Sequence, residues 1–255
     1  MTLVKTEIAQ DGIALITLDR ADKRNALNTA LRRDLIAAVA SALDDDTLHA
    51  LVLTGAGGHF CAGGDIDSMA ELTPRTGRAR MKDGQRLVRM LHDAEKPVIA
   101  AVEGFAVGAG AGLALLADSI VIGDGATIGF PFFRVGLVPD FALLHTMPRR
   151  IGGARARDLL LFARMVAAKD AVAMGLADQL VPKGEAVAQA SARARELAAM
   201  PPHAFALAKR QLALAPQDLD QALEQEAMAQ SLCFVGEELA EGRRAFLEKR
   251  APRFR

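Results

Sequence analysis

Short, continuously apolar stretches recur along the first two thirds of the chain, and segments with helical periodicity separate them. Three such stretches lie at Ala50–Thr54, Val98–Val102 and Ser119–Gly123, with a helical pattern near Met81–His92 between the first two. Apolar runs of this length are typical of strands that are buried on both faces, as in parallel sheets covered by helices. The alternation therefore predicts an α/β fold whose core is wound in repeating turns.

The N-terminal segment has the pattern of a β-hairpin. Val4–Ala9 and Ile13–Asp19 are short apolar or alternating runs on either side of Asp11 and Gly12, a pair that favours a tight turn. Asn28 then stands where a helix N-cap is expected, ahead of a run of apolar residues with helical spacing. We expect the chain to open with strands and to continue as β-α-β units.

Helical patterns dominate after Gly153. Three of them near the C-terminus are Ala204–Leu214, Leu219–Phe234 and Glu237–Glu248. Their apolar stripes are more than one small core can cover, so some are expected to face another subunit. We therefore predict a core over residues 1–195 and a helical oligomerisation region over residues 196–255.

The composition excludes several classes of protein. Lys+Arg and Asp+Glu are both 31, so no net basic field attracts nucleic acid. The two cysteines, Cys61 and Cys233, are too few for a disulfide framework or a zinc cluster, which fits a reducing compartment. No segment reaches the roughly 20 apolar residues of a membrane span. A cytoplasmic protein that acts without a membrane or a metal is expected.

Two glycine-rich segments, Thr54–Ile66 and Glu103–Leu113, each follow a buried strand and are each expected to open a helix. Glycine lets the backbone approach a ligand closely, and a helix start leaves N–H donors without partners. Two such turns that converge would form an oxyanion hole. The alternative for either segment alone is tight packing, and the glycine spacing does not match a dinucleotide-binding fingerprint.

Six stretches, in order and at family spacing, resemble the crotonase (enoyl-CoA hydratase/isomerase) family. They are Lys23–Asn28, Phe60–Ile66, Lys96–Val102, Gly136–Pro139, Ala173–Asp178 and Phe246–Arg250. The resemblance covers essentially the whole chain. It implies a crotonase-like spiral of ββα repeats with a C-terminal helical trimerisation region, assembled as a homotrimer or hexamer. It also implies an acyl-CoA substrate and no separate cofactor, because coenzyme A is part of the substrate.

The same resemblance assigns the site residues. Two backbone N–H groups, those of Gly64 and Ala109, are the implied oxyanion donors. CoA adenine is expected against the backbone at Ala26 and Ala62, with Arg24 near the phosphates. The full set of implied substrate-binding residues is Arg24, Ala26, Ala62, Asp65, Ile66, Phe132 and Lys249, of which Lys249 would reach CoA phosphate across a subunit boundary or is a solvated helix end.

The sequence departs from the hydratases of this family at two positions. Those enzymes carry glutamates where this chain has Gly112 and Phe132. Water addition needs an acid and a base around one water, so their loss disfavours hydration. Asp140 stands where related isomerases and 4-chlorobenzoyl-CoA dehalogenases carry a catalytic aspartate. Its alternative role is that of a helix N-cap.

We therefore expect an acyl-CoA isomerase in which Asp140 moves a proton while the backbone at Gly64 and Ala109 holds the enolate oxygen. The alternatives left open are an enoyl-CoA hydratase, a dehalogenase or hydrolase-like member, and a catalytically silent CoA-binding protein. The sequence does not specify the acyl group. It also does not explain Glu103, which stands where relatives usually have asparagine.

Overall fold

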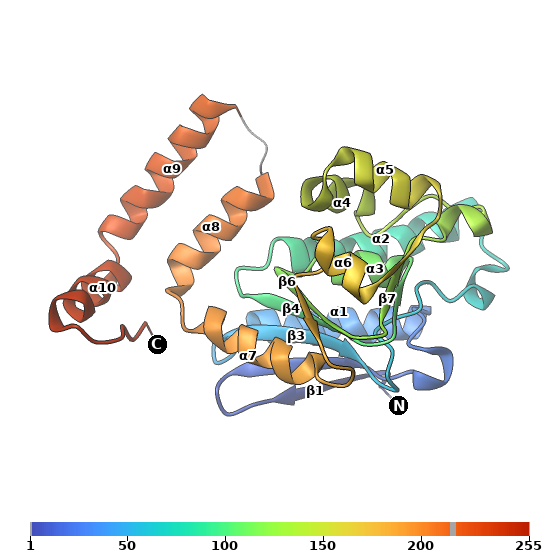
Figure 1. Cartoon of the computed structure of the whole chain (residues 1–255), viewed down its shortest axis with the longest axis horizontal. Coiled ribbons are helices and arrows are strands. Elements are labelled where there is room, and N and C mark those ends of the chain that lie inside the picture. Colours follow the sequence, from blue (N-terminus) through green and yellow to red (C-terminus); the bar gives the residue numbers. More distant parts are fainter. Residues whose placement is uncertain (1, 215–217, 255) are drawn as a thin grey trace.

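The computed structural model describes residues 2–214 and 218–254, and its centre is a six-stranded sheet (Figure 1). The strands in spatial order are β1 (Val4–Ile8), β2 (Ile13–Leu18), β3 (Ala50–Gly55), β4 (Val98–Val102), β6 (Ser119–Gly123) and β9 (Gln179–Val181). The first two form an antiparallel hairpin, and every later pair in the sheet is parallel. The predicted hairpin and the predicted buried strands are confirmed.

A smaller sheet of three strands lies beside the first. It contains β5 (Phe105–Val107), β7 (Thr127–Gly129) and β8 (Met165–Ala167), with β5 and β7 parallel and β7 and β8 antiparallel. The second glycine-rich segment supplies β5, so this sheet fixes the position of that segment in the fold.

Helices surround the sheets. They are α1 (Thr29–Asp44), α2 (Pro74–His92), α3 (Ala109–Ala114), α4 (Leu143–Ile151), α5 (Gly153–Leu161), α6 (Ala168–Ala173), α7 (Ala186–Ala198), α8 (Pro202–Leu214), α9 (Leu219–Phe234) and α10 (Glu237–Glu248). Helix α7 packs on β3, β4 and β6, whereas α1 packs on β1, β2 and α2. The last three helices extend away from the sheets (Figure 1).

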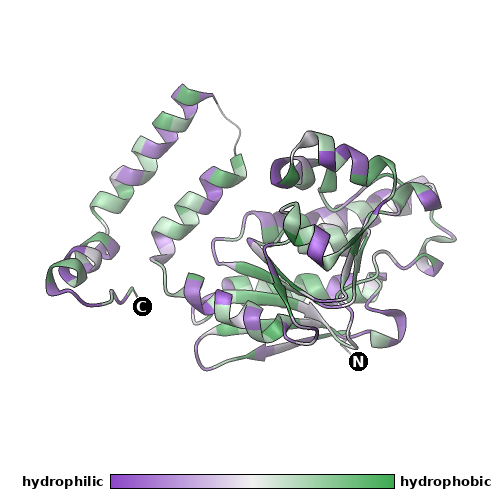
Figure 2. Cartoon of the chain, viewed as in Figure 1, coloured by the Kyte–Doolittle hydropathy of each residue, from purple (hydrophilic) through white to green (hydrophobic). Residues whose placement is uncertain are grey.

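The strands alternate between two apolar clusters because successive side chains point to opposite faces. In β3, Ala50 and Val52 belong to the cluster under α7, and Leu51 and Leu53 belong to the larger cluster on the other face. The central strands β3, β4 and β6 are accordingly buried along nearly their whole length, and the middle of the sheet is mostly green in Figure 2. This two-sided burial explains why the strands read as unbroken apolar runs.

Side-chain caps set the starts of several helices. Asn28 Oδ1 accepts a 2.8 Å hydrogen bond from Leu31 N–H at the start of α1, as predicted. Helix α2 begins at Pro74, seven residues before the predicted Met81, because Thr73 and Thr76 form a capping box and Pro74 is tolerated in the first turn. The predicted start of the second helix was therefore wrong.

The start of α7 is fastened to the loop between β4 and β5 by Glu103. Its Oε1 accepts hydrogen bonds from Gly184 N–H at 2.9 Å and Ala186 N–H at 3.2 Å. These are donors at the start of a helix that have no partner within the helix. Glu103 is therefore a capping residue supplied from a distant loop.

The division of the chain into residues 1–195 and 196–255 stays a prediction. Its boundary, residue 195, lies inside α7.

Helix α8 is anchored to the core through a partly buried lysine. Lys209 Nζ lies 2.7 Å from Asp118 Oδ2 and 3.1 Å from Lys96 O, and Asp118 Oδ2 also accepts a bond from Val98 N–H. Beyond α8, the helices α9 and α10 expose large apolar side chains, among them Leu219, Leu223, Met228, Leu232, Phe246 and Leu247.

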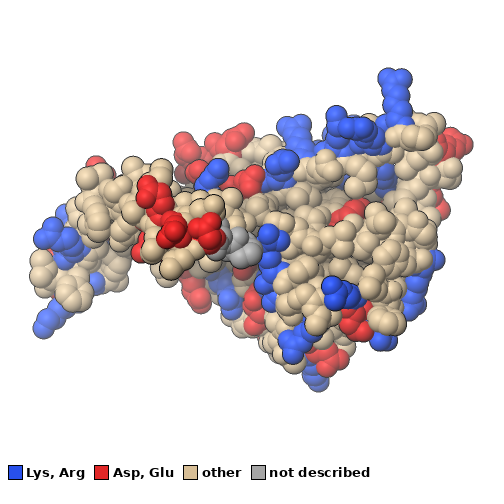
Figure 3. All heavy atoms as spheres, turned by 90° about the horizontal axis from the view of Figure 1, so that it is seen from above, with Lys and Arg blue, Asp and Glu red and all other residues tan. Residues whose placement is uncertain are grey.

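Charges of both signs are interspersed over the face of the molecule in Figure 3, and neither sign covers it. This agrees with the equal numbers of basic and acidic residues. In the part of the chain that the structure describes, no helix combines the length and apolar character needed to cross a bilayer.

Candidate active site

The two glycine-rich segments run side by side. Cys61 N–H donates to Phe105 O at 2.8 Å, and Val107 N–H donates to Cys61 O at 2.9 Å. Cys61 and Ala106 form an isolated parallel bridge. The convergence that the sequence suggested is therefore achieved by backbone pairing along both segments.

Two backbone donors are left without partners where the segments meet. Among the described residues, neither Gly64 N–H nor Ala109 N–H donates a hydrogen bond within the chain. A Cβ on Gly63, whose φ is +100°, would lie 2.7 Å from Val107 O and 3.6 Å from Ala109 N. The segments are thus in close contact at Gly63, and a side chain there would separate them.

The first glycine-rich segment does not open an α-helix as predicted. Gly64 pairs with Leu27 in an isolated bridge, and the chain then makes one short 3-10 helix, η2 (Asp67–Met69). Leu27 N–H donates to Gly63 O at 2.7 Å, which ties the segment to the loop before α1. The parallel bridge with Leu27, and not the start of an α-helix, orients Gly64 N–H.

Asn25 holds the same segment from the other side. It is fully buried with φ +59°, and its Nδ2 donates to Ala56 O at 2.9 Å and His59 O at 2.7 Å. Its Oδ1 accepts from Arg20 N–H at 2.9 Å. One amide side chain therefore connects the loop before α1 with the first glycine-rich segment.

Asp140 presents a carboxyl group that has no partner on one oxygen. Its Oδ1 is buried and makes no hydrogen bond. Burial raises the pKa of Asp140 to about 6, although Arg32 and Arg80 oppose the rise through their positive charge. Asp140 is not a helix cap, because the N-cap of α4 is Ala142 and no side chain bonds there. The capping alternative for Asp140 was wrong.

The segment after Asp140 has an unusual backbone that packing explains. Phe141 and Ala142 both adopt positive φ, at 48° and 59°. A Cβ on Gly112 would lie only 2.4 Å from Phe141 Cβ, and one on Gly84 would lie 3.5 Å from its ring. Phe141 thus fills the space beside Gly112 and fixes the direction in which the chain leaves Asp140.

Two arginines that the sequence analysis did not select lie near Asp140. Arg32 of α1 is 6% exposed, and burial lowers its pKa to about 10. Arg80 of α2 donates to Ser68 Oγ at 3.0 Å. A signal was present, since Arg32 shares the buried face of α1 with Leu35 and Val39 at helical spacing.

The predicted substrate-binding residues do not all lie together. Arg24 is exposed in a left-handed conformation, with Cζ 5.6 Å from the Phe105 ring centroid, and its carbonyl accepts from Ala62 N–H at 2.9 Å. Ala26 O accepts a bond from Arg20 Nη1 at 2.9 Å. These residues lie together at one end of the first glycine-rich segment.

Asp65 and Ile66 differ in environment although they are adjacent. The Asp65 carboxylate is buried and pairs with Arg20 at 2.6 Å, whereas Ile66 is mostly exposed. Phe132 is buried, with its ring beside Gly108. Lys249 is the C-cap of α10, a helix that lies away from the sheets, so a single chain does not bring it to the other residues (Figure 1).

Cys61 is a packed residue, as predicted. It is completely buried, its Sγ contacts Asn25 O at 3.1 Å, and burial raises the pKa of its thiol to about 12. The thiol therefore stays protonated near neutral pH and is not a nucleophile.

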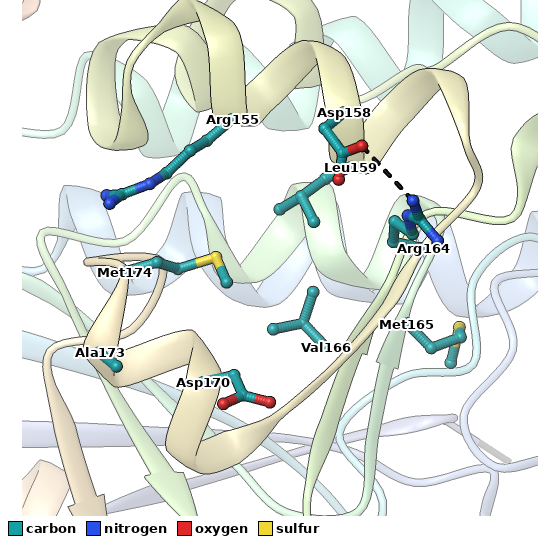
Figure 4. Close-up of a pocket in the computed structure, with 9 residues that line it drawn as sticks. All are labelled: Arg155, Asp158, Leu159, Arg164, Met165, Val166, Asp170, Ala173 and Met174. Atoms are coloured by element: carbon teal, nitrogen blue, oxygen red, sulfur yellow. Dashed lines mark ion pairs between the residues drawn. The ribbon is translucent and has the colours of Figure 1, made fainter.

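A separate open hollow of about 450 Å³ lies between α5, β8 and α6 (Figure 4). Arg155, Asp158, Arg164 and Asp170 supply its charged lining, and Arg164 and Asp158 approach each other at 3.5 Å. None of the predicted site residues lines it.

Comparisons with known proteins agree along the whole chain. The family model for enoyl-CoA hydratase/isomerase matches residues 8–255. A Rhodobacter capsulatus protein named "Probable enoyl-CoA hydratase" is 38% identical over 252 residues, covering 98% of this chain and 97% of that protein. The 1,2-epoxyphenylacetyl-CoA isomerase of Escherichia coli is 35% identical, with 96% and 95% covered. The crystal structure of enoyl-CoA hydratase from Bacillus anthracis superposes with TM-score 0.94 at 28% identity, with 99% and 98% covered.

Proposed function

The chain belongs to the enoyl-CoA hydratase/isomerase (crotonase) family, and we propose that it is an isomerase of acyl-CoA thioesters. The observation that carries this proposal is the carboxyl group of Asp140, whose Oδ1 has no hydrogen-bond partner and whose pKa is raised to about 6. A general base works best when its pKa lies near the working pH. One such group is enough to take a proton from one carbon and return it to another.

The proposed reaction uses the two free backbone donors. The thioester carbonyl oxygen accepts hydrogen bonds from Gly64 N–H and Ala109 N–H, and these bonds strengthen as negative charge develops on that oxygen. Asp140 removes a proton from the acyl chain, which leaves an enolate, and then delivers it to a different carbon. Atoms balance without water. Since α3 has only six residues, the donors themselves and not a long helix dipole supply the stabilisation.

We propose that the CoA portion extends over Arg24, Ala26 and Ala62, with Lys249 supplied by a neighbouring copy. Arg24 is exposed and its guanidinium is available to phosphate. Helix α10 is remote from the glycine-rich segments of its own chain, which supports a contribution in trans (Figure 1). Ile66 and Phe132 would border the pantetheine and acyl groups, while Asp65 would keep its pairing with Arg20.

Hydration of an enoyl-CoA is the second candidate, and the names of similar proteins favour it. The Rhodobacter relative and the Bacillus structure are both named as enoyl-CoA hydratases. Against it stand the two positions that carry glutamate in family hydratases. Gly112 has Phe141 packed where a side chain would begin, and Phe132 is apolar and buried. Asp140 alone does not provide both an acid and a base around one water.

A panel of purified acyl-CoA thioesters, read by mass spectrometry together with chromatographic retention, separates the candidates. The panel contains enoyl, ring-containing and halogenated acyl groups. Isomerisation changes retention without changing mass, hydration adds one water, and dehalogenation replaces halide by hydroxyl. Rapid gain of water with crotonyl-CoA, and no mass-neutral product from any substrate, would overturn the isomerase proposal in favour of the hydratase.

A further inference from the structure

Arg32 is unusual among the buried charged side chains of the described residues. Asp65 pairs with Arg20 at 2.6 Å, and Glu241 pairs with Arg250 at 2.7 Å. Arg32, at 6% exposure, makes no ion pair in the described part of the chain, and its Nε has no hydrogen-bond partner. A buried charge without a counter-ion is costly. The arrangement leaves the Arg32 guanidinium able to form an ion pair with an anion from outside the chain.

Arg80 places a second guanidinium beside the first. Arg32 Nη1 donates to Arg80 O at 3.3 Å. Arg80 itself donates to Ser68 Oγ at 3.0 Å and to Leu27 O at 3.3 Å, which are both neutral acceptors. Within residues 2–214 and 218–254, no carboxylate lies within ion-pair distance of Arg80. Two cations therefore share this region without a direct counter-ion.

Arg32 and Arg80 lie on the side of the candidate site where the acyl group of the substrate is proposed to bind. Arg80 Nη2 lies 3.8 Å from the point where a Cβ on Gly64 would stand. One helical turn further along α2, Gly84 contacts the ring of Phe141, the residue after Asp140. The arginine face of α2 thus extends from the proposed thioester position to the proposed proton carrier. Asp83 and Asp140 act on Arg32 through their charge, and Asp65 and Asp140 act on Arg80, but in the described residues none of these carboxylates forms an ion pair with either guanidinium.

We propose that the candidate site takes a CoA thioester whose acyl chain ends in a carboxylate, which Arg32 and Arg80 bind. The inference rests on the proposed function because it uses the thioester position at Gly64. A guanidinium fork matches the two oxygens of a carboxylate, and the Nε of Arg32 has no acceptor within the described residues. An alkyl chain of the same length would give neither guanidinium a direct ion pair.

Calorimetric titration with freshly prepared saturated thioesters, which carry no double bond to move or hydrate, tests the inference without requiring turnover. Succinyl-, glutaryl- and adipyl-CoA are compared with butyryl-, pentanoyl- and hexanoyl-CoA, which match them in carbon number. Hydrogen bonds to charged groups predict that the best carboxylated ligand binds roughly 10- to 100-fold more tightly than its alkyl counterpart.

Substitutions of single arginines show which side chains cause the preference for carboxylated thioesters. Arg80→Gln should bring the affinity ratio close to one, and so should Arg32→Gln where its circular dichroism shows that it folds. Arg78→Gln, an exposed arginine on the same helix, should keep the ratio of the parent protein. A preference that survives in Arg80→Gln would show that other groups bind the carboxylate and would overturn the assignment.

The failures of the two proposals are distinguishable. Equal affinity for carboxylated and alkyl thioesters, together with mass-neutral turnover of an enoyl-CoA, would overturn the carboxylate inference alone. Absence of binding by every thioester would overturn both proposals. A preference for carboxylated ligands that is lost in Arg80→Gln supports the inference whichever reaction the enzyme catalyses.

Discussion

At the scale of single residues, Asp140 combines two properties that a proton carrier needs. Its carboxyl is partly buried with one unpartnered oxygen, and it is attached to a segment whose direction Phe141 fixes. Asp140→Asn should therefore lower turnover on the order of 10²- to 10⁴-fold, as expected for loss of a general base. Binding of saturated thioesters measured beside turnover shows that the site is intact. Turnover at the parent rate would remove Asp140 from the chemistry.

The raised pKa of Asp140 predicts two effects of pH. Turnover at low substrate should rise through pH about 6 as the carboxyl ionises. Folding stability should respond in the opposite sense. Between its ordinary value of 3.8 and about 6, the folded state holds a proton that the unfolded state has released, so this group lowers stability as pH rises through that window.

Asp140→Asn removes this titration. The unfolding free energy of the variant minus that of the parent should be more positive at pH 7 than at pH 4. Urea unfolding of both proteins at the two pH values measures this difference. An identical stability difference at both pH values would show that the Asp140 pKa is not raised in the folded protein.

A substitution at Gly112 tests how closely Phe141 packs at the position where family hydratases carry a glutamate. Gly112→Ala places a Cβ against the backbone and Cβ of Phe141, which overpacks the site and should cost about 1–3 kcal/mol of unfolding free energy. Gly77→Ala in α2 is the matched control, because nothing lies within 4 Å of its new Cβ, and it should stabilise by up to about 1 kcal/mol. Chemical denaturation measures both. Equal effects of the two substitutions would contradict the close packing at Gly112.

Individual site residues were predictable from the sequence only where the residue type itself determines the local backbone, as glycine does. The glycines of both segments and the absence of side chains at Gly112 were visible in the sequence. The environment of Asp140 was not, because the left-handed Phe141 and Ala142 depend on contacts with distant helices and not on local preference. For Arg32, helical spacing within α1 marks the buried face, but the depth of its burial depends on α2 packing across α1.

At the scale of elements, Glu103 links the loop before β5 to the start of α7. Glu103→Ala should lower unfolding free energy by about 0.5–2 kcal/mol, the usual effect of losing a cap, because two N–H groups lose their acceptor. Glu185 is an exposed acidic residue at the start of the same helix, and its side chain makes no capping hydrogen bond. Glu185→Ala should therefore have less than half the effect of Glu103→Ala. Denaturant midpoints compare the two. A larger loss for Glu185→Ala would contradict the capping role.

Most element types and several boundaries followed from periodicity, and the exceptions have a physical explanation. Helix α2 has few apolar residues in its first two turns, so its start was set by the Thr73 and Thr76 capping box and not by an apolar stripe. The first glycine-rich segment was expected to open a helix, but pairing with Leu27 holds it extended instead. Tertiary contacts of this kind have no local signal in the sequence.

At the scale of the whole molecule, α9 and α10 expose apolar side chains that their own chain leaves uncovered. We propose a homotrimer or hexamer in which these helices contact a neighbour, as the family resemblance implies. Light scattering during gel filtration should give a mass of three or six chains. Met228→Asp in α9 should shift the mass to smaller species, whereas Gln10→Asp in the exposed β1–β2 turn should not. A parent protein that runs as a monomer would contradict the proposal and remove Lys249 from the site.

The left-handed pair Phe141 and Ala142 has a stereochemical consequence. Phe141 lies beside Gly84 and Gly112, so in the proposed reaction we expect the Asp140 carboxyl to meet the enolate from one side only. A proton lifted from one face then returns to that same face, so migration is suprafacial. A substrate carrying deuterium at the abstracted position should yield product of one configuration with label partly retained. A racemic product would mean that the carboxyl swings freely or that solvent delivers the proton.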